Sequence, residues 1–135
     1  MNTTLDIILR LLLAAALGAG IGYQRERYNK PAGLRTHALI CIGAALFTVV
    51  SMFGFPESAD PSRVAAAVVT GIGFIGAGVI FRGVRGEHIV TGLTTAASVW
   101  VTAAIGLAAG VGMYLIASII AVITVLILII PKLRG

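Results

Sequence analysis

Two short stretches with nearly the same sequence hold the residues best suited to bind a ligand. Residues 33–38 read GLRTHA and residues 92–97 read GLTTAA, and each opens an apolar run after a short basic segment. Glycine permits a tight bend before a helix, and threonine can accept hydrogen bonds from free N–H groups of the first turn. Two helix N-termini that meet concentrate positive potential, which suits an anion, a lipid head group or an acidic partner. The candidate ligand- or partner-binding residues are therefore Arg25, Glu26, Gly33, Arg35, Thr36, His37, Gly92, Thr94 and Thr95.

The same residues also have a purely structural interpretation. Every helix start needs caps, and arginines near a membrane surface extend toward the head groups. Glu26 lies between Arg25 and Arg27, which is typical of an exposed interfacial salt bridge. His37 and His88 lie at the same predicted surface, where a histidine can sense pH but more often has no such role. The sequence leaves both interpretations open.

Acidic residues are too few and too scattered for metal or acid–base chemistry. The chain has five Asp and Glu residues, and only Asp6 comes near an apolar segment. A Mg²⁺ or Ca²⁺ site needs several oxygen ligands together, and no nucleophile with a histidine partner is apparent. We expect no enzyme activity, no catalytic residue, no metal site and no cofactor. Cys41 lies inside an apolar block and is expected to be a small packing residue.

Glycines recur at spacings that match two different motifs. GIGFIG at residues 71–76 fits the dinucleotide-binding pattern, but that pattern functions only between a strand and a helix. Here it lies inside an apolar segment, where small residues let helices approach closely in lipid. Pairs spaced four apart at Gly18 and Gly106 have the same use. The predicted helix-packing residues are Gly18, Gly22, Gly71, Gly73, Gly76, Gly78, Gly106 and Gly110.

The composition predicts that a lipid bilayer surrounds these residues. Of 135 residues 59% are hydrophobic and 11% are charged, whereas a soluble domain has about 25% charged residues. Backbone groups in lipid must pair internally, so spans are helices or closed barrels, and the alternation expected of a barrel strand is absent. The net charge is +5, but the basic residues lie between apolar blocks, which argues against nucleic acid as a partner. We predict a single all-α integral membrane domain.

Five membrane spans are expected in this domain. Residues 93–130 carry no charge, and one helix of that length would reach about 57 Å, well beyond the roughly 30 Å of hydrocarbon. The block must therefore fold back, with Gly106, Gly110 and Gly112 marking the turn and Pro131 ending the last helix. The N-terminal segment lacks the basic start of a signal peptide, so the first helix should be retained. The predicted spans are 7–23, 36–55, 64–81, 93–108 and 112–130.

The charged residues between the spans predict the orientation of the chain. Arg10 and Arg63 lie on one side of the five-span arrangement. The positive-inside rule then places the N-terminus outside and the C-terminus in the cytoplasm. Three polar residues are expected to be structural: Asp60 as a helix N-cap before Pro61, Arg63 and Trp100, while Asp6 and Arg10 are spaced to pair on one helix. The basic residues of the other side are Arg25, Arg27, Lys30, Arg35, Arg82, Arg85, Lys132 and Arg134.

The chain also resembles itself. A shift of 58 aligns LGAGIGYQR at 17–25 with IGAGVIFRG at 75–83, and a shift of 59 aligns residues 32–46 with 91–105. Two helical hairpins would then stand side by side in the same orientation, related by a pseudo-twofold axis along the membrane normal. The two Gly-Leu-x-Thr turns would face each other at the cytoplasmic surface, and the fifth helix would have no counterpart.

Four long strings resemble the MgtC/SapB family of bacterial inner-membrane proteins. They are LGAGIGYQRER, KPAGLRTHALICIGAALF, DPSRVAAAVVTGIGFIGAGVIFR and GLTTAASVWVTAAIGLAAG, and the resemblance covers about residues 5–130. The resemblance implies five spans, a link to growth in low magnesium and, for some members, survival inside host cells. The family motifs map onto Arg25 and Glu26, Gly33 to Thr36, Asp60 and Arg63, Gly71 to Gly78, and Gly92 to Thr95 with Trp100.

The resemblance also implies that some members act on other membrane proteins, including the F-type ATP synthase, rather than carrying Mg²⁺. Longer members continue into a cytoplasmic C-terminal domain, whereas this sequence stops at PKLRG. The first hypothesis is a non-enzymatic membrane protein that supports adaptation to magnesium limitation through a membrane partner. The alternatives are a small ion or solute transporter with a pathway between the repeats, and a homodimeric scaffold without a ligand.

Overall fold

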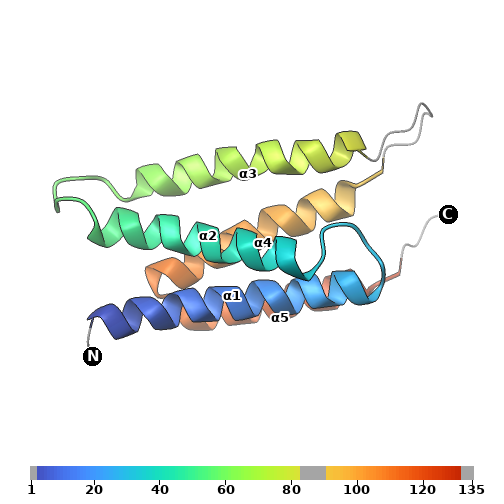
Figure 1. Cartoon of the computed structure of the whole chain (residues 1–135), viewed down its shortest axis with the longest axis horizontal. Helices are drawn as coiled ribbons and strands as arrows, with labels where there is room; N and C mark the ends of the chain where they lie inside the picture. The colour runs from blue at the N-terminus through green and yellow to red at the C-terminus, as the bar shows by residue number, and fades with distance from the viewer. Residues whose placement is uncertain (1–2, 83–90, 132–135) are drawn as a thin grey trace.

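The computed structural model describes residues 3–82 and 91–131, and these residues form a bundle of five antiparallel helices (Figure 1). Four helices are long and apolar enough to cross a membrane, and α5 is a shorter apolar helix of 16 residues that lies alongside α1. The all-α membrane architecture with two hairpins and a fifth helix is therefore confirmed. The helices are α1 (Thr3–Arg27), α2 (Leu34–Phe53), α3 (Ser62–Arg82), α4 (Leu93–Val111) and α5 (Tyr114–Ile129).

The fold-back between α4 and α5 is a two-residue turn at Gly112 and Met113. Gly112 has φ +94°, and the N–H groups of Gly112 and Met113 donate to the carbonyls of Ala109 and Ala108 at 3.1 and 2.9 Å. This pattern ends many helices because it satisfies the last free carbonyls. The expectation that Gly106 and Gly110 also belong to the turn is wrong, since both lie within α4.

Helix α2 lies between α1 and α4, and glycines allow it to approach both. A Cβ atom added at Gly18 of α1 would lie 2.5 Å from the carbonyl oxygen of His37 on α2. One added at Gly110 of α4 would lie 2.8 Å from the carbonyl oxygen of Ala45 on α2. Gly22 and Gly106 also face α2 at distances that exclude a side chain. Backbones that approach this closely gain the dispersion contacts that hold helices together in lipid.

The contact between the two hairpins is apolar and closed. Cys41 and Ala45 of α2 and Ile105 and Ala109 of α4 are at most 1% exposed and belong to one hydrophobic cluster. The same cluster includes Ala117 of α5. Small side chains fill this contact, and the buried hydroxyls of Thr48 and Thr102 nearby donate to the carbonyls of Ala44 and Ser98 on their own helices.

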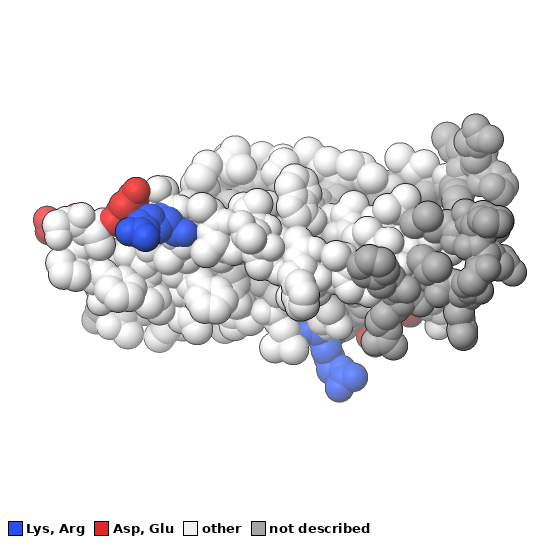
Figure 2. Space-filling model, turned by 90° about the horizontal axis from the view of Figure 1, so that it is seen from above, with Lys and Arg blue, Asp and Glu red and all other residues white. Residues whose placement is uncertain are grey.

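Helix α3 packs mainly on α4 and only lightly on α2. Of the residues in its most apolar segment 11% are buried, against 50% in α4. Gly76 contacts Ala96 of α4, with a distance of 3.6 Å to an added Cβ, whereas Gly71, Gly73 and Gly78 have no atom of the described chain within 4 Å. Much of the face in Figure 2 carries no charged side chain. Three of the predicted packing glycines thus face outward from the chain.

A polar cluster joins three helices at the end of the bundle that holds the N-terminus. Arg10 pairs with Asp6 at 2.7 Å and donates from Nη1 to the carbonyl oxygen of Gly110 at 2.8 Å. The Tyr114 hydroxyl donates to the other oxygen of Asp6 at 2.6 Å, and the Arg10 guanidinium lies 5.5 Å from the centre of the Phe53 ring. The predicted pair of Asp6 and Arg10 is present on α1, and through Gly110 and Tyr114 it also links α1 to α4 and α5.

Replacing Arg10 by methionine should lower the thermal midpoint of the protein by several degrees. The change removes a hydrogen bond from a charged group to the Gly110 carbonyl, which is worth about 1.5–3 kcal/mol in proteins. Arg63→Met is the matched control, because Arg63 is exposed near the same end of the bundle. Both midpoints can be measured in the same detergent by fluorescence-detected chromatography after heating. Equal midpoints for the two variants would contradict a structural role for Arg10.

Asp60 precedes α3 and caps it. Its Oδ1 accepts hydrogen bonds from the Ser62 hydroxyl at 2.7 Å and from the Ser62 N–H at 2.9 Å. These two hydrogen bonds, the hydroxyl first, hold the pKa of the Asp60 carboxyl below its usual range. Arg63 is exposed beside it. Asp60 therefore marks the start of α3, and no other acidic side chain is found in contact with it in the described part of the chain.

Candidate functional site

The basic end of the bundle is the end formed by residues 25–37 and by the start of α4 at Gly92. Helix α1 ends there because Asn29 adopts φ +57°, and the Lys30 N–H donates to the Arg25 carbonyl at 2.9 Å. The Glu26 carboxylate then accepts from the Leu34 N–H at 3.1 Å. The last turn of α1 therefore caps α2, and a Cβ at Gly33 would lie 2.5 Å from Glu26 Oε1.

The start of α4 differs from the start of α2. Gly92 has φ +90°, a left-handed conformation, and a Cβ there would lie 3.0 Å from the Val79 carbonyl oxygen. Neither Gly33 nor Gly92 is followed by a side-chain cap from its own turn. The prediction that Thr36 and Thr94 or Thr95 cap these helices is therefore wrong. Thr36 and Thr94 are exposed.

A buried polar cluster lies between α1, α2 and α4 at this end. Arg25 is 4% exposed and donates from Nη2 to the Thr95 hydroxyl and to the Pro31 carbonyl. His37 is fully buried, and its Nε2 lies 3.0 Å from the Ser98 hydroxyl. We call Arg25, His37, Thr95, Ser98 and Thr102 the Arg25 cluster; Thr102 belongs to it because its hydroxyl donates to the Ser98 carbonyl at 2.6 Å.

The hydrogen bonds of His37 are compatible with two protonation states. Its Nδ1 lies 3.0 Å from the Gly33 carbonyl oxygen, which can only accept. The Ser98 hydroxyl lies 2.8 Å from the Thr95 carbonyl and 3.0 Å from His37 Nε2, but it has one proton to donate. If that proton goes to Thr95, Nε2 must donate and His37 is cationic; if it goes to Nε2, His37 is neutral.

The positive charge of Arg25 has no counter-charge among the described residues that contact it. Its Nε is buried without a hydrogen-bond acceptor in the part of the chain that the structure describes. The nearest acid in sequence, Glu26, is exposed and caps α2 instead. Charged groups within a membrane domain are costly to bury and are commonly functional. Arg25 is therefore the strongest single candidate for a functional residue.

The structure brings together only some of the predicted site residues. Arg25, His37 and Thr95 meet, whereas Arg35 and Thr94 are exposed at the rim and Trp100, 57% exposed, lies beside α3. Ser98 and Thr102 were missed. With Thr95 they form a polar stripe at spacings of three and four on an apolar helix, and this pattern would have revealed them. His88 lies outside the described residues.

Metal ligands do not converge in residues 3–82 and 91–131. No group of three His, Cys, Asp or Glu side chains there is placed to hold a metal ion. Gln24, next to Arg25, donates to the Leu128 carbonyl at 3.4 Å, and its own Oε1 is buried without a donor among the residues that the structure describes. The functional candidate at the basic end is thus a cluster of one cation, one histidine and hydroxyl groups.

Fold and site together define a multi-pass membrane protein made of two parallel helical hairpins, a closing fifth helix and a buried arginine between the hairpins. Its family follows from comparison with known proteins. The model of the MgtC family matches residues 11–133, and the chain belongs to this family.

Three relatives illustrate the extent of the similarity. The chain is 52% identical over 132 residues to a protein of Escherichia coli K12 named putative magnesium transporter YhiD. The aligned segment covers 93% of this chain and 60% of the relative. It is 42% identical over 116 residues to SapB of Bacillus subtilis, with 81% and 49% covered. It is 50% identical over 107 residues to MgtC of Salmonella typhimurium, with 79% and 44% covered.

The chain spans about half the length of the curated relatives that it matches. No solved structure is significantly similar to it. What these relatives do as whole proteins therefore bears on this chain only as a basis for proposals.

Proposed function

We propose that this protein supports adaptation to magnesium limitation by acting on a membrane partner, without enzymatic activity. The observation that carries the proposal is the closed apolar contact between the hairpins together with the uncompensated charge of Arg25. A pathway for Mg²⁺ needs oxygen ligands, because the ion gives up its water reluctantly. Residues such as Cys41, Ala45 and Ile105 offer none at the middle of the bundle.

The partner would approach from the basic end, which the positive-inside rule predicts to be the cytoplasmic one. An acidic side chain of the partner held over this end would place a negative charge near the buried Arg25, which has no counter-charge among the described contacts. Arg35 and Thr94, exposed at the rim, would border that contact. The resemblance to the family suggests the F-type ATP synthase as the first partner to test.

Site-specific photo-crosslinking in intact cells tests the partner. A photoreactive amino acid at Thr94 should form an adduct with a second membrane protein when cells are starved of magnesium, and Arg25→Met should weaken that adduct. The same amino acid at Leu115, which is 71% exposed on α5, serves as the control and should give no such adduct. Adducts that contain only this protein would contradict the proposal.

Transport is the second candidate, because one relative is named a putative magnesium transporter. Under this alternative the Arg25 cluster would line one mouth of a pathway that opens between the hairpins. Purified protein in liposomes loaded with a Mg²⁺ indicator separates the two functions. Flux above that of protein-free liposomes, reduced by Thr95→Val, would favour transport over partner binding.

A further inference from the structure

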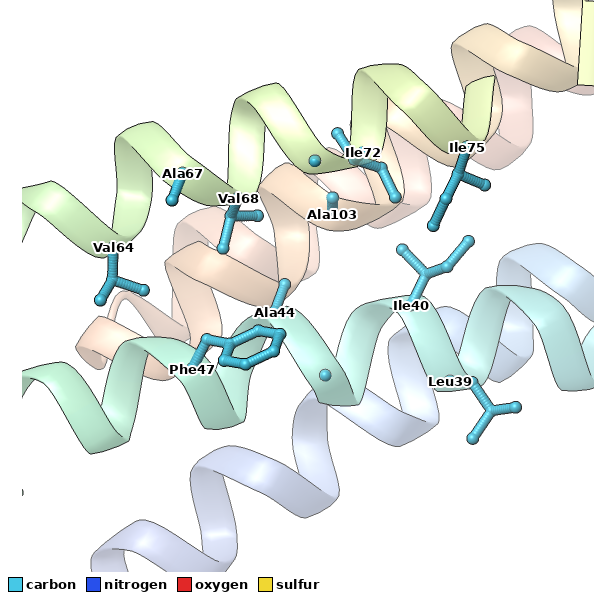
Figure 3. Close-up of a pocket in the computed structure, with 12 residues that line it drawn as sticks. Leu39, Ile40, Ala44, Phe47, Val64, Ala67, Val68, Ile72, Ile75 and Ala103 are labelled. Carbon is cyan, nitrogen blue, oxygen red and sulfur yellow. The ribbon is translucent and has the colours of Figure 1, made fainter. Parts of the chain in front are cut away.

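An apolar groove of about 610 Å³ runs between α2 and α3. Figure 3 shows that side chains of both helices, such as Phe47 and Ile40 on α2 and Val68 and Ile75 on α3, point into it, and that Ala103 of α4 lies at its base. The twelve residues that line the groove are all Leu, Ile, Val, Phe, Ala or Gly. Apolar exposure is ordinary in lipid, so the composition of the groove alone does not indicate a partner.

The internal repeat indicates that a helix belongs in this groove. The groove side of α3 lies between residues 64 and 75, and the shift of 58 places it on residues 6–17 of α1. That side of α1 is covered by α5: the Tyr114 hydroxyl bonds Asp6, and Leu13 and Leu17 pack in one cluster with Ala117 of α5. The first hairpin therefore carries a helix at the position where the second hairpin has an open groove.

The surface around the groove is complementary to itself. Leu39 and Phe47 line the groove and are 69% and 63% exposed. Phe74 lies seven residues after the groove-lining Ala67, and therefore on the same face of α3, and is 83% exposed. Gly43 and Gly71 lie on the same surface, and nothing in the described chain comes within 4 Å of a Cβ added at either. Projecting side chains and hollows on one patch are what a twofold contact between identical subunits requires.

We infer that the α2–α3 groove is the interface of a homodimer in which α3 of a second copy covers the groove of the first. A twofold axis along the membrane normal keeps both copies in the same orientation, so that each Phe74 faces the glycines of its neighbour. Gly43 and Gly71 let the helix backbones approach, which is the main source of helix association in lipid. No charged side chain has to be desolvated, because none lines the groove. This inference does not depend on the proposed function.

Filling the groove should abolish the dimer without unfolding the chain. Gly43→Leu and Gly71→Leu add side chains where the described chain leaves open space, and Gly20→Leu does the same on α1, away from the groove. We expect light scattering in mild detergent to give a dimer mass for the wild type and for Gly20→Leu. The two groove variants should be monomers with unchanged thermal midpoints. A monomeric wild type, or groove variants that remain dimers, would overturn the inference.

Disulfide formation in native membranes tests the same contact without detergent. In a Cys41→Ala background, Phe74→Cys should cross-link to itself on mild oxidation, and Gly71→Leu should suppress that product. Val122→Cys on α5, whose wild-type side chain is 60% exposed, is the control and should stay monomeric. Cross-linking through position 122 instead of 74 would place the dimer on another face. A Phe74→Cys chain that joins only a different protein, or a groove that only acyl chains occupy, would equally refute it.

Discussion

Gly106→Leu should leave little or no folded protein, the largest loss of stability that we expect from one substitution. A Cβ at Gly106 would already overlap the carbonyl oxygen of Cys41 and come within 3.0 Å of the Ala44 Cβ. Overpacking in a core costs about 1–3 kcal/mol when side chains can move aside. Here the obstacle is the backbone of α2, held in turn against α1, so the cost should exceed that range.

Detergent-extracted protein measured by fluorescence-detected chromatography shows the outcome. Gly106→Leu should give aggregate or no peak, and Gly106→Ala should give a folded peak with a reduced thermal midpoint. Gly20→Leu is the matched control, because an added side chain there meets no atom within 4 Å in the described chain. If Gly106→Leu were as stable as Gly20→Leu, the close approach of α2 and α4 would be wrong.

Arg25→Met should abolish function while the protein stays at least as stable as the wild type. The substitution removes two hydrogen bonds from a charged group, which together contribute a few kcal/mol. It also removes a buried charge that has no counter-charge in the described contacts, and burial of such a charge costs several kcal/mol. Methionine fills most of the same volume with apolar atoms. These terms oppose each other, so the net effect on stability should be small or favourable.

Two measurements on the same variant separate a functional Arg25 from a structural one. In a strain that lacks its own MgtC-family protein, the wild-type gene should restore growth in low magnesium and Arg25→Met should not, at equal amounts in the membrane. The thermal midpoint of the purified variant should equal or exceed that of the wild type. Arg27→Met, at an exposed position on the same helix, should retain growth. A variant with a strongly lowered midpoint would show that Arg25 mainly supports the fold.

The candidate site could be predicted only in part from the sequence, because the spacing of residues does not specify which polar side chains are buried. The paired Gly-Leu-x-Thr turns precede α2 and α4, whose first turns contribute His37 and Thr95 to the Arg25 cluster. They did not show that Glu26 caps α2 across the turn or that Thr95 faces inward to accept from Arg25. The side that a helix turns inward depends on its neighbours, so Thr95 and Thr94 separate only in the folded bundle.

By itself the sequence determined the solvent, the helices and the repeat. Few charges, long apolar blocks and the backbone's need for internal hydrogen bonds in lipid leave little alternative to helices. The positions that allow a positive φ, such as Gly112, are local properties of the chain. Local chemistry therefore fixes where helices end.

Only the tertiary structure decided which glycines serve the bundle and which face outward. Gly106 and Gly71 both belong to small-residue motifs that predict helix packing. In the structure Gly106 lies against α2, whereas Gly71 faces the open groove. That difference arises because α2 packs along α4 but only lightly against α3, so Gly106 is covered and Gly71 is left open in the described chain. Packing depends on distances between segments far apart in the chain, and no local pattern records them.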